Sequence, residues 1–297
     1  MSEYKKEEWR VKQPAADIRA LAEQFSISPI LAHIIVNREI TEPDAVACYL
    51  SDDLAYTHDP ALMKDMDKGC QIMKEKIRAG KKIRIISDYD VDGITSNYIL
   101  YQGLQKAGAD VSYDIPHRIM DGYGMNVRLV EAAYADGVDT IITCDNGIAA
   151  ETAVTRAKEL GMTVIVTDHH EVPYIEENGE RKEQLPPALA VVDPKRADDT
   201  YPFSGICGGV VALKLIQAIT EKTGNPGLVN IQEELLEFAA LSTVCDVMEL
   251  KDENRILVKE GLKRIQKGYN EGLKALMEVN DLSLIHISEP TRHLRIS

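Results

Sequence analysis

The stretch from Lys82 to Thr95, KIRIISDYDVDGIT, constrains this chain more than any other part of it. Its first half is short and rich in β-branched residues, which predicts a buried strand. Three carboxylates follow at every second position: Asp88, Asp90 and Asp92. Side chains two residues apart in extended backbone lie on one face, so we expect these carboxylates to gather just past the strand end. Because like charges this close repel unless a cation lies among them, the stretch predicts a metal site.

Two other interpretations compete for this motif. A DxDxDG sequence also begins the EF-hand calcium loop, which requires a bidentate Glu at its twelfth position. Counted from Asp88 that position is Ile99, and the preceding segment is strand-like, so we reject calcium. An isolated acidic loop is most often simply solvated. The remainder of the chain favours the metal site.

Composition is typical of a globular protein. Of its residues, 44% are hydrophobic and 28% are charged. A length of 297 residues is enough for one large domain or two smaller ones. We find no apolar run of membrane-spanning length and no apolar signal core in MSEYKKEEW. The five cysteines include no CxxC pair, which indicates reduced thiols and a cytoplasmic protein. A net charge of −14 argues against adhesion to nucleic acid over the whole surface, but a metal cluster and a local basic groove would still serve a nucleic-acid enzyme.

Strands and helices alternate after a helical N-terminal region, residues 1–80. Within that region we predict helices over Ala16–Phe25, Ser28–Asn37, Glu42–Leu50 and Ala61–Ala79. The alternation from Lys82 onward predicts an α/β fold with a mostly parallel sheet flanked by helices. The charged segment Glu171–Pro187 has no apolar period and is interpreted as a surface loop. We expect the catalytic domain over residues 81–250, connecting helices over 251–280 and a separate tail over 281–297.

The expected strands after Lys82–Ser87 are Asp110–Ile115, Val138–Thr143, Met162–Thr167 and Ala188–Val192; the expected helices are Ile94–Ala107, Asn126–Ala135, Ile148–Leu160, Ile206–Thr220, Gln232–Thr243 and Asn254–Gln266. Ligands bind beyond the carboxyl ends of parallel strands. Asp145 directly follows one of these strands and Asp168-His169-His170 follows the next, so we expect them to face the first motif.

Carboxylate oxygen combined with imidazole nitrogen suits Mn²⁺, with Mg²⁺ as the abundant competitor. Such a set can hold two cations about 3.5–4 Å apart, which together activate a water and neutralise phosphoryl charge. Asp145 is placed to bridge the two cations. One of His169 and His170 can ligate while the other faces substrate. A structural zinc site is not expected without a cysteine pair.

This ordered set resembles the DHH phosphoesterase superfamily, and more finely its RecJ branch of single-stranded-DNA-specific 5′→3′ exonucleases. The resemblance is carried by DYDVDG, DNG and DHH, by the loop PHRIMDGYG from Pro116, by YPFSGICGGVVALKL from Tyr201 and by LSTVCDVMEL around Asp246. It runs from about residue 14 to about residue 280. It implies an exonuclease of DNA repair and recombination that acts on single-stranded DNA, with single-strand-binding protein and a helicase as partners.

The resemblance also implies roles for particular residues. Asp90, Asp92, Asp145, His169 and Asp246 match the family's metal ligands, with Asp145 as the bridging one. A His common in many relatives is replaced here by Ile86, and Asp88 is expected to supply that ligand. His170 is expected at the scissile phosphate, which makes Asp88, Asp145 and His170 the catalytic candidates. Arg118 is a candidate phosphate contact, and so are the amides of Gly208 and Gly209, for which close helix packing is an equal alternative.

The resemblance ends near Asn280. The last residues, NDLSLIHISEPTRHLRIS, have no helical period and read as a foreign or frame-broken end, and the second substrate domain of the family is not seen. We therefore expect metal binding without processive digestion. Three alternatives stay open: a DHH phosphodiesterase on short oligonucleotides, cyclic dinucleotides or pyrophosphate, a haloacid-dehalogenase-type phosphatase with an aspartyl nucleophile, and a chain without enzymatic activity.

Overall fold

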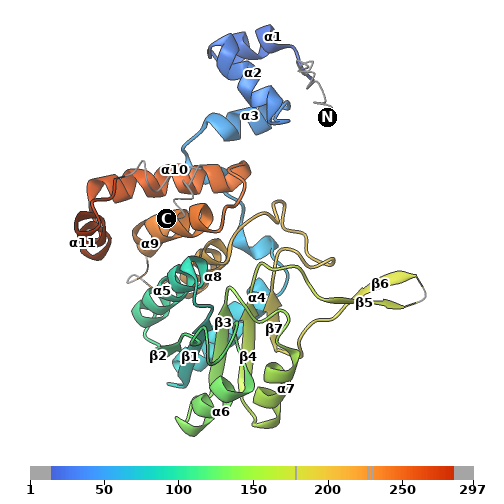
Figure 1. Cartoon of the computed structure of the whole chain (residues 1–297), viewed down its shortest axis with the longest axis vertical. Coiled ribbons are helices and arrows are strands. Elements are labelled where there is room, and N and C mark those ends of the chain that lie inside the picture. Colours follow the sequence, from blue (N-terminus) through green and yellow to red (C-terminus); the bar gives the residue numbers. More distant parts are fainter. Residues whose placement is uncertain (1–14, 178, 226–227, 229, 284–297) are drawn as a thin grey trace, which may run out of the picture. The chain divides into compact units, whose positions relative to one another are not determined.

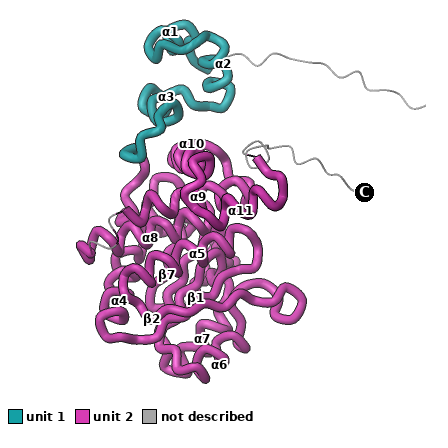
Figure 2. The backbone as a smooth tube through the Cα atoms, turned by 90° about the vertical axis from the view of Figure 1, so that its left-hand side faces the viewer, with its two compact units in different colours: residues 1–56 teal, residues 57–297 magenta. Residues whose placement is uncertain are grey.

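The computed structural model describes residues 15–283 except 178, 226–227 and 229 (Figure 1). Contacts divide the chain into two compact units, residues 1–56 and 57–297 (Figure 2). The sequence placed domain boundaries at residues 80 and 250, and those boundaries remain predictions. Residues 284–297 of the predicted tail lie outside the described residues.

The smaller unit is a cluster of short helices. Their bounds are α1 (Ile18–Gln24), α2 (Pro29–Asn37) and α3 (Pro43–Leu50), followed by a 3-10 turn over Leu54–Tyr56. The Ser28 hydroxyl accepts from the Leu31 amide at the start of α2 (3.2 Å), and proline opens both α2 and α3. Buried side chains such as Leu21, Ile35 and Val46 form its own small core. All three predicted helices of this unit are confirmed.

The larger unit is built on a five-stranded sheet whose strands, among the described residues, pair only in parallel. The strands are β1 (Lys82–Ser87), β2 (Asp110–Asp114), β3 (Thr140–Cys144), β4 (Thr163–Thr167) and β7 (Ala190–Val192), in the spatial order β2-β1-β3-β4-β7 (Figure 1). The order reverses between β1 and β3, and ligands in open sheets bind at such a reversal, beyond the carboxyl ends. The predicted α/β fold is confirmed.

Helices cover the sheet and extend beyond it. They are α4 (Met66–Arg78), α5 (Val91–Lys106), α6 (Val127–Ala135), α7 (Glu151–Glu159), α8 (Gly208–Thr223), α9 (Ile231–Cys245), α10 (Asp252–Lys267) and α11 (Glu271–Val279). Apolar residues of β1, β3, β4 and β7 pack with those of α6 and α7 in one core cluster. Helix α4 approaches the sheet at Gly69, where an added Cβ would lie 3.8 Å from Ile165 and 3.9 Å from Ala190. Helix α5 approaches α8 at Gly103, where a Cβ would lie 2.4 Å from Ile216.

Two expectations about secondary structure are wrong. The helix predicted over Ala61–Ala79 is interrupted: a 3-10 turn over Pro60–Leu62 is followed by α4 from Met66. Asp65 adopts φ +61°, and its carboxylate accepts from the Val191 amide at 3.1 Å, so a tertiary contact overrides the helical pattern.

The segment Glu171–Pro187, predicted as a loop, contains an antiparallel hairpin of β5 (Tyr174–Glu177) and β6 (Glu180–Glu183), which projects away from the sheet (Figure 1). The Asn-Gly pair at 178–179 is a typical two-residue hairpin turn sequence that was not recognised.

No helix within the described ranges combines the length and the apolar character that crossing a membrane requires.

Candidate metal centre

The first motif lies at the junction of β1 and α5. Asp88 follows the strand and is buried, at 1% exposure. Asp90 caps α5, and its carboxylate accepts from the Gly93 amide at 2.9 Å. Because α5 begins at Val91, Asp92 lies in its first turn and not on an extended face. The expectation that the three carboxylates share one strand face is therefore wrong, although all three do lie at the site.

Asp92 is held by the neighbouring helices. Its two carboxylate oxygens accept from the amides of Gly208 and Gly209 at 2.7 and 2.8 Å, at the first turn of α8, and from the Ser242 hydroxyl of α9. An amide pair at a helix N-terminus favours a negative partner, and here that partner is a side chain. Asp92 already uses these two amides in this structure, and the phosphate contact expected of them remains a prediction.

Close packing explains the glycine pair. A Cβ on Gly208 would lie 2.7 Å from the Asp145 Cβ, and one on Gly209 would lie 2.0 Å from the Ser242 hydroxyl oxygen. Both distances are far below van der Waals contact. The glycines therefore allow α8 to approach Asp92 and Asp145, which is the alternative that the sequence had left open.

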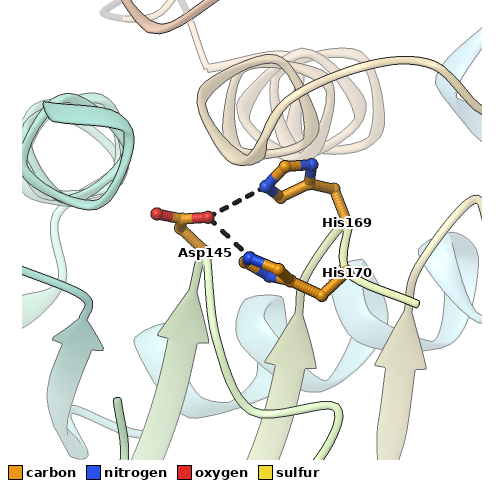
Figure 3. Close-up of side chains that lie close together, drawn as sticks. All are labelled: Asp145, His169 and His170. Atoms are coloured by element: carbon orange, nitrogen blue, oxygen red, sulfur yellow. Dashed lines mark hydrogen bonds and ion pairs between the residues drawn. The ribbon is translucent and has the colours of Figure 1, made fainter. Parts of the chain in front are cut away.

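Asp145 follows β3 and lies among the other carboxylates. It is 2% exposed, and its carboxylate oxygen Oδ1 lies 3.0 Å from Nε2 of His169 (Figure 3). Burial, followed by the negative charges of Asp92 and Asp90, raises the pKa of Asp145 to about 11. The folded site without a cation therefore holds a proton on this carboxyl at neutral pH.

Asp168 organises the two imidazoles that follow β4. One of its oxygens, Oδ1, accepts from the backbone amides of His169 and His170 at 2.7 and 3.3 Å and from Nδ1 of His170 at 2.7 Å; the other accepts from the Ile148 amide at 2.9 Å. Burial would raise the pKa of Asp168, but the bond from His170 and the amide bonds lower it overall. This ionised carboxylate positions both rings.

The two imidazoles differ in their surroundings. The His169 side chain is 5% exposed, and burial is the main reason that its pKa is lowered. The His170 side chain is 44% exposed, and the hydrogen bond to Asp168 raises its pKa. Figure 3 shows both rings directed toward the Asp145 carboxylate. The structure therefore pairs one neutral, enclosed imidazole with one that readily carries a positive charge at the mouth of the site.

Asp246 completes the site from α9, whose last helical residue precedes it. Its carboxylate lies 3.7 Å from Nε2 of His169, and Asp92 lies 3.3 Å from the same nitrogen. Burial and the charges of Asp92 and Asp90 raise the pKa of Asp246 to about 6. Three carboxylates thus converge on one nitrogen of an imidazole whose lowered pKa favours the neutral ring.

These residues form three overlapping groups that could hold metal ions. The groups are Asp88, Asp90 and Asp145; Asp92, His169 and Asp246; and Asp145, His169 and His170. Asp145 belongs to two of them, as a bridging ligand would. All six predicted ligands lie in these groups, and their roles as ligands remain predictions.

One buried atom supports the fit to a cation. Within the described part of the chain, Oδ1 of Asp88 has no hydrogen-bond partner. Buried polar atoms are normally paired, so an unpaired carboxylate oxygen amid like charges indicates a place for a positive ion. The donor set of carboxylate oxygens and one imidazole suits Mn²⁺ or Mg²⁺.

The loop between β2 and α6 reaches the same site. The Tyr123 hydroxyl donates to the Asp145 carbonyl at 3.1 Å and lies 3.0 Å from Nε2 of His170. The guanidinium of Arg118 lies 5.4 Å from the centre of the Tyr89 ring. The phosphate contact predicted for Arg118 remains a prediction.

Sequence reasoning assigned no role to Tyr123 or Asp168. Both residues belong to motifs that carry the family resemblance, GYG and DHH, but the sequence did not indicate which groups they contact.

Comparison with known proteins agrees with this geometry. The DHH family, N-terminal domain, matches residues 82–243. The chain is 36% identical over 284 residues to the single-stranded-DNA-specific exonuclease RecJ of Bacillus subtilis, covering 95% of this chain and 34% of that protein. The RecJ of Thermus thermophilus is 36% identical over 238 residues, covering 76% and 33%. The chain thus spans about a third of the length of these relatives.

Solved structures show the same fold. A crystal structure of RecJ from Thermus thermophilus in complex with Mn²⁺ aligns with 91% of this chain and 37% of that one, with a TM-score of 0.71 and 29% identity. A crystal structure of exonuclease RecJ bound to manganese covers 80% and 56%, with a TM-score of 0.66 and 33% identity. With the family match extending over more than half of its residues, this chain belongs to the DHH family.

Proposed function

We propose that this chain carries the two-metal centre of a single-stranded-DNA exonuclease of the RecJ type, which hydrolyses phosphodiester bonds. The observation that carries the proposal is the set of three overlapping carboxylate and imidazole groups, two of which share Asp145 and two of which share His169. The relatives, which are single-stranded-DNA-specific exonucleases, and the solved RecJ structures with manganese or magnesium support it.

The ligands divide into two sets. Asp88 and Asp90 would hold one cation, and Asp92, His169 and Asp246 the other. Asp145, which groups with Asp88 and Asp90 and lies 3.0 Å from Nε2 of His169, would be shared between them. When bound, two Mn²⁺ or Mg²⁺ ions would activate a water and neutralise charge on the phosphoryl oxygens. The amides of α8 keep the Asp92 carboxylate oriented for this purpose.

His170 is the proposed contact to the scissile phosphate. Its raised pKa favours protons on both ring nitrogens, so that Nδ1 donates to Asp168 while Nε2, 3.0 Å from the Tyr123 oxygen, would exchange that contact for a phosphate oxygen. Tyr123 in turn donates its own proton to the Asp145 carbonyl. This chain of hydrogen bonds holds a positive charge beside Asp145, where an anionic phosphate would arrive. Asp88, Asp145 and His170 are our catalytic candidates, with Arg118 as a substrate contact.

The biological setting is proposed from the relatives. We infer digestion in the 5′→3′ direction, a role in DNA repair and recombination, and work in the cytoplasm beside single-strand-binding protein and a helicase. The support is the relatives' named substrate, single-stranded DNA.

Titration with Mn²⁺ tests the proposal directly. The unsubstituted chain should take up two ions, and Asp145→Asn should take up fewer because the shared ligand is weakened. Asparagine is the suitable replacement, since Asp145 has φ +59°, a conformation that asparagine tolerates better than alanine. Asp139→Asn, on the far end of the sheet at the start of β3, is the control. Uptake of two ions by both variants would refute the shared role of Asp145.

A nuclease assay on the same proteins addresses the substrate. The probes are a 5′-labelled single-stranded oligonucleotide, its duplex form and a dinucleotide, each with Mn²⁺. Release of 5′ nucleotides from the single strand would support exonuclease action, and His170→Ala should slow it while sparing Mn²⁺ uptake. Cleavage of the dinucleotide alone would favour a DHH phosphodiesterase of short substrates.

A further inference from the structure

A fourth strand end borders the metal centre. Strand β7 is parallel to β4, with Thr167 opposite Val192, and the Asp168 amide donates to the Val192 carbonyl at 3.0 Å. Asp168-His169-His170 follows one of these paired residues, and Asp193-Pro194-Lys195 follows the other. The two tripeptides therefore leave neighbouring strands at the same level. An ion pair of 3.3 Å between Lys195 and Glu171, the residue after His170, joins them.

The two basic residues that follow β7, Lys195 and Arg196, differ in the contacts they make. The guanidinium of Arg196 is 5% exposed, and it donates to both carboxylate oxygens of Asp198 at 2.8 and 2.9 Å, to Asp65 at 3.2 Å and to the Val191 carbonyl. Arg196 is therefore fully engaged in fixing the backbone. The adjacent amide of Lys195 is fixed as well, since it donates to the buried Asp193 carboxylate at 2.9 Å.

The ammonium of Lys195 is held much more weakly. Its side chain is 26% exposed, and the ion pair with Glu171 is the one salt bridge it makes among the described residues. Glu171 is 87% exposed, and ion pairs with such exposed partners contribute little to stability. The structure thus presents a cation on a rigid backbone with a partner that it can readily exchange.

The charge of Lys195 reaches the metal centre. Burial and neighbouring carboxylates dominate the pKa values of His169 and Asp246, yet the ammonium lowers both. It acts in the same direction on His170, against the larger effect of Asp168. Its ion pair with Glu171, the residue that follows His170, places the ammonium beside the β4 end of the site.

We propose that Lys195 binds a phosphate oxygen of the nucleotide held at the metal centre, exchanging Glu171 for the substrate. This proposal rests on the proposed function, because it needs a phosphate at that centre. Lys195 would act from the β7 side of the site while His170 acts from β4. A purely structural lysine would instead balance the charge of the carboxylates, and its replacement would then weaken nucleotide binding no more than replacement of a control lysine.

The test measures nucleotide and metal binding separately. Thymidine 5′-monophosphate is titrated into the Mn²⁺-loaded chain, and binding is followed by calorimetry and by the relaxation that Mn²⁺ imposes on the ³¹P nucleus. Lys195→Ala should bind the nucleotide about 10- to 100-fold more weakly, as expected for the loss of a charge-assisted hydrogen bond. Its Mn²⁺ affinity should stay equal or rise, since a positive charge near the cations is removed.

Two further variants sharpen the result. Lys195→Arg should retain most of the nucleotide affinity, and Glu171→Gln should raise it by releasing the ammonium. Lys182→Ala is the matched control, because Lys182 is an exposed lysine of the β5–β6 hairpin in a similar ion pair with Glu177 at 3.4 Å. Nucleotide affinity that is equal in Lys195→Ala and Lys182→Ala would overturn the proposal, as would a Mn²⁺-loaded chain that binds no nucleotide. Failure of the unsubstituted chain to bind Mn²⁺ would overturn the proposed function itself, and this proposal with it.

Discussion

Asp145→Asn should stabilise the metal-free protein while removing its stabilisation by Mn²⁺. The pKa of Asp145 is raised from 3.8 to about 11 by burial and by nearby carboxylates. Between these two values the folded chain holds a proton that the unfolded chain has lost, so this residue makes stability fall as pH rises. The slope for one such group is about 1.4 kcal/mol per pH unit.

The magnitude at neutral pH follows from this linkage. About 3.2 pH units separate pH 7 from the ordinary pKa of 3.8, which corresponds to a penalty of up to about 4 kcal/mol for Asp145. Asparagine cannot ionise, and its side-chain oxygen can still accept from Nε2 of His169. The variant should therefore be more stable than the unsubstituted chain at pH 7, and the difference should widen from pH 5 to pH 8.

Urea unfolding in the presence of a chelator measures this difference. Addition of Mn²⁺ at about 100 times its Kd should then stabilise the unsubstituted chain by about 2.7 kcal/mol per site and the variant by less. Asp139→Asn serves as the control of opposite sign: burial would raise the pKa of Asp139, but the hydrogen bond from Lys76 lowers it overall. A metal-free Asp145→Asn protein less stable than the unsubstituted chain, with an unchanged pH slope, would refute the argument from crowded carboxylates.

Three further predictions concern packing, a buried ion pair and pH. Gly209→Ala places a methyl group 2.0 Å from the Ser242 hydroxyl oxygen. We expect the free energy of unfolding in urea to fall by about 1–3 kcal/mol and Mn²⁺ to bind more weakly. Unchanged values would contradict the close approach of α8. Lys214→Met leaves the fully buried Glu253, its partner at 2.8 Å, without a countercharge. We expect the free energy of unfolding to fall by about 3–5 kcal/mol. The double variant Lys214→Met with Glu253→Gln should recover much of this loss. Mn²⁺ affinity measured by calorimetry should rise from pH 5 to pH 7, because the ion displaces protons from Asp145 and from Asp246, whose pKa is raised to about 6. An affinity independent of pH would show that neither carboxyl is a ligand.

Much of the fold could be predicted because its signals are local. The β-branched runs before Asp88, Asp145 and Asp168 are strands, and the spacing between them is enough for crossover helices, so a parallel sheet follows. The errors arose where distant contacts decide. The helix expected from Ala61 is interrupted at Asp65, whose carboxylate is used by β7, a partner far along the chain.

The candidate site shows the same division. The residue types at the strand ends follow from the sequence alone, because polar residues that directly follow buried strands must emerge at one edge of a parallel sheet. What each of these residues contacts depends on the packing of distant elements. It placed Asp92 against the amides of Gly208 and Gly209 and buried Asp145 where its proton is hard to remove.

Lys195 illustrates the physical reason. Nothing in DPKR distinguishes its two basic residues. The structure engages Arg196 with three partners, whereas the Lys195 ammonium makes one ion pair among the described residues, with the exposed Glu171. Hydrogen bonding and burial depend on side chains brought together from separate strands and helices, and those distances are set by packing rather than by spacing along the chain.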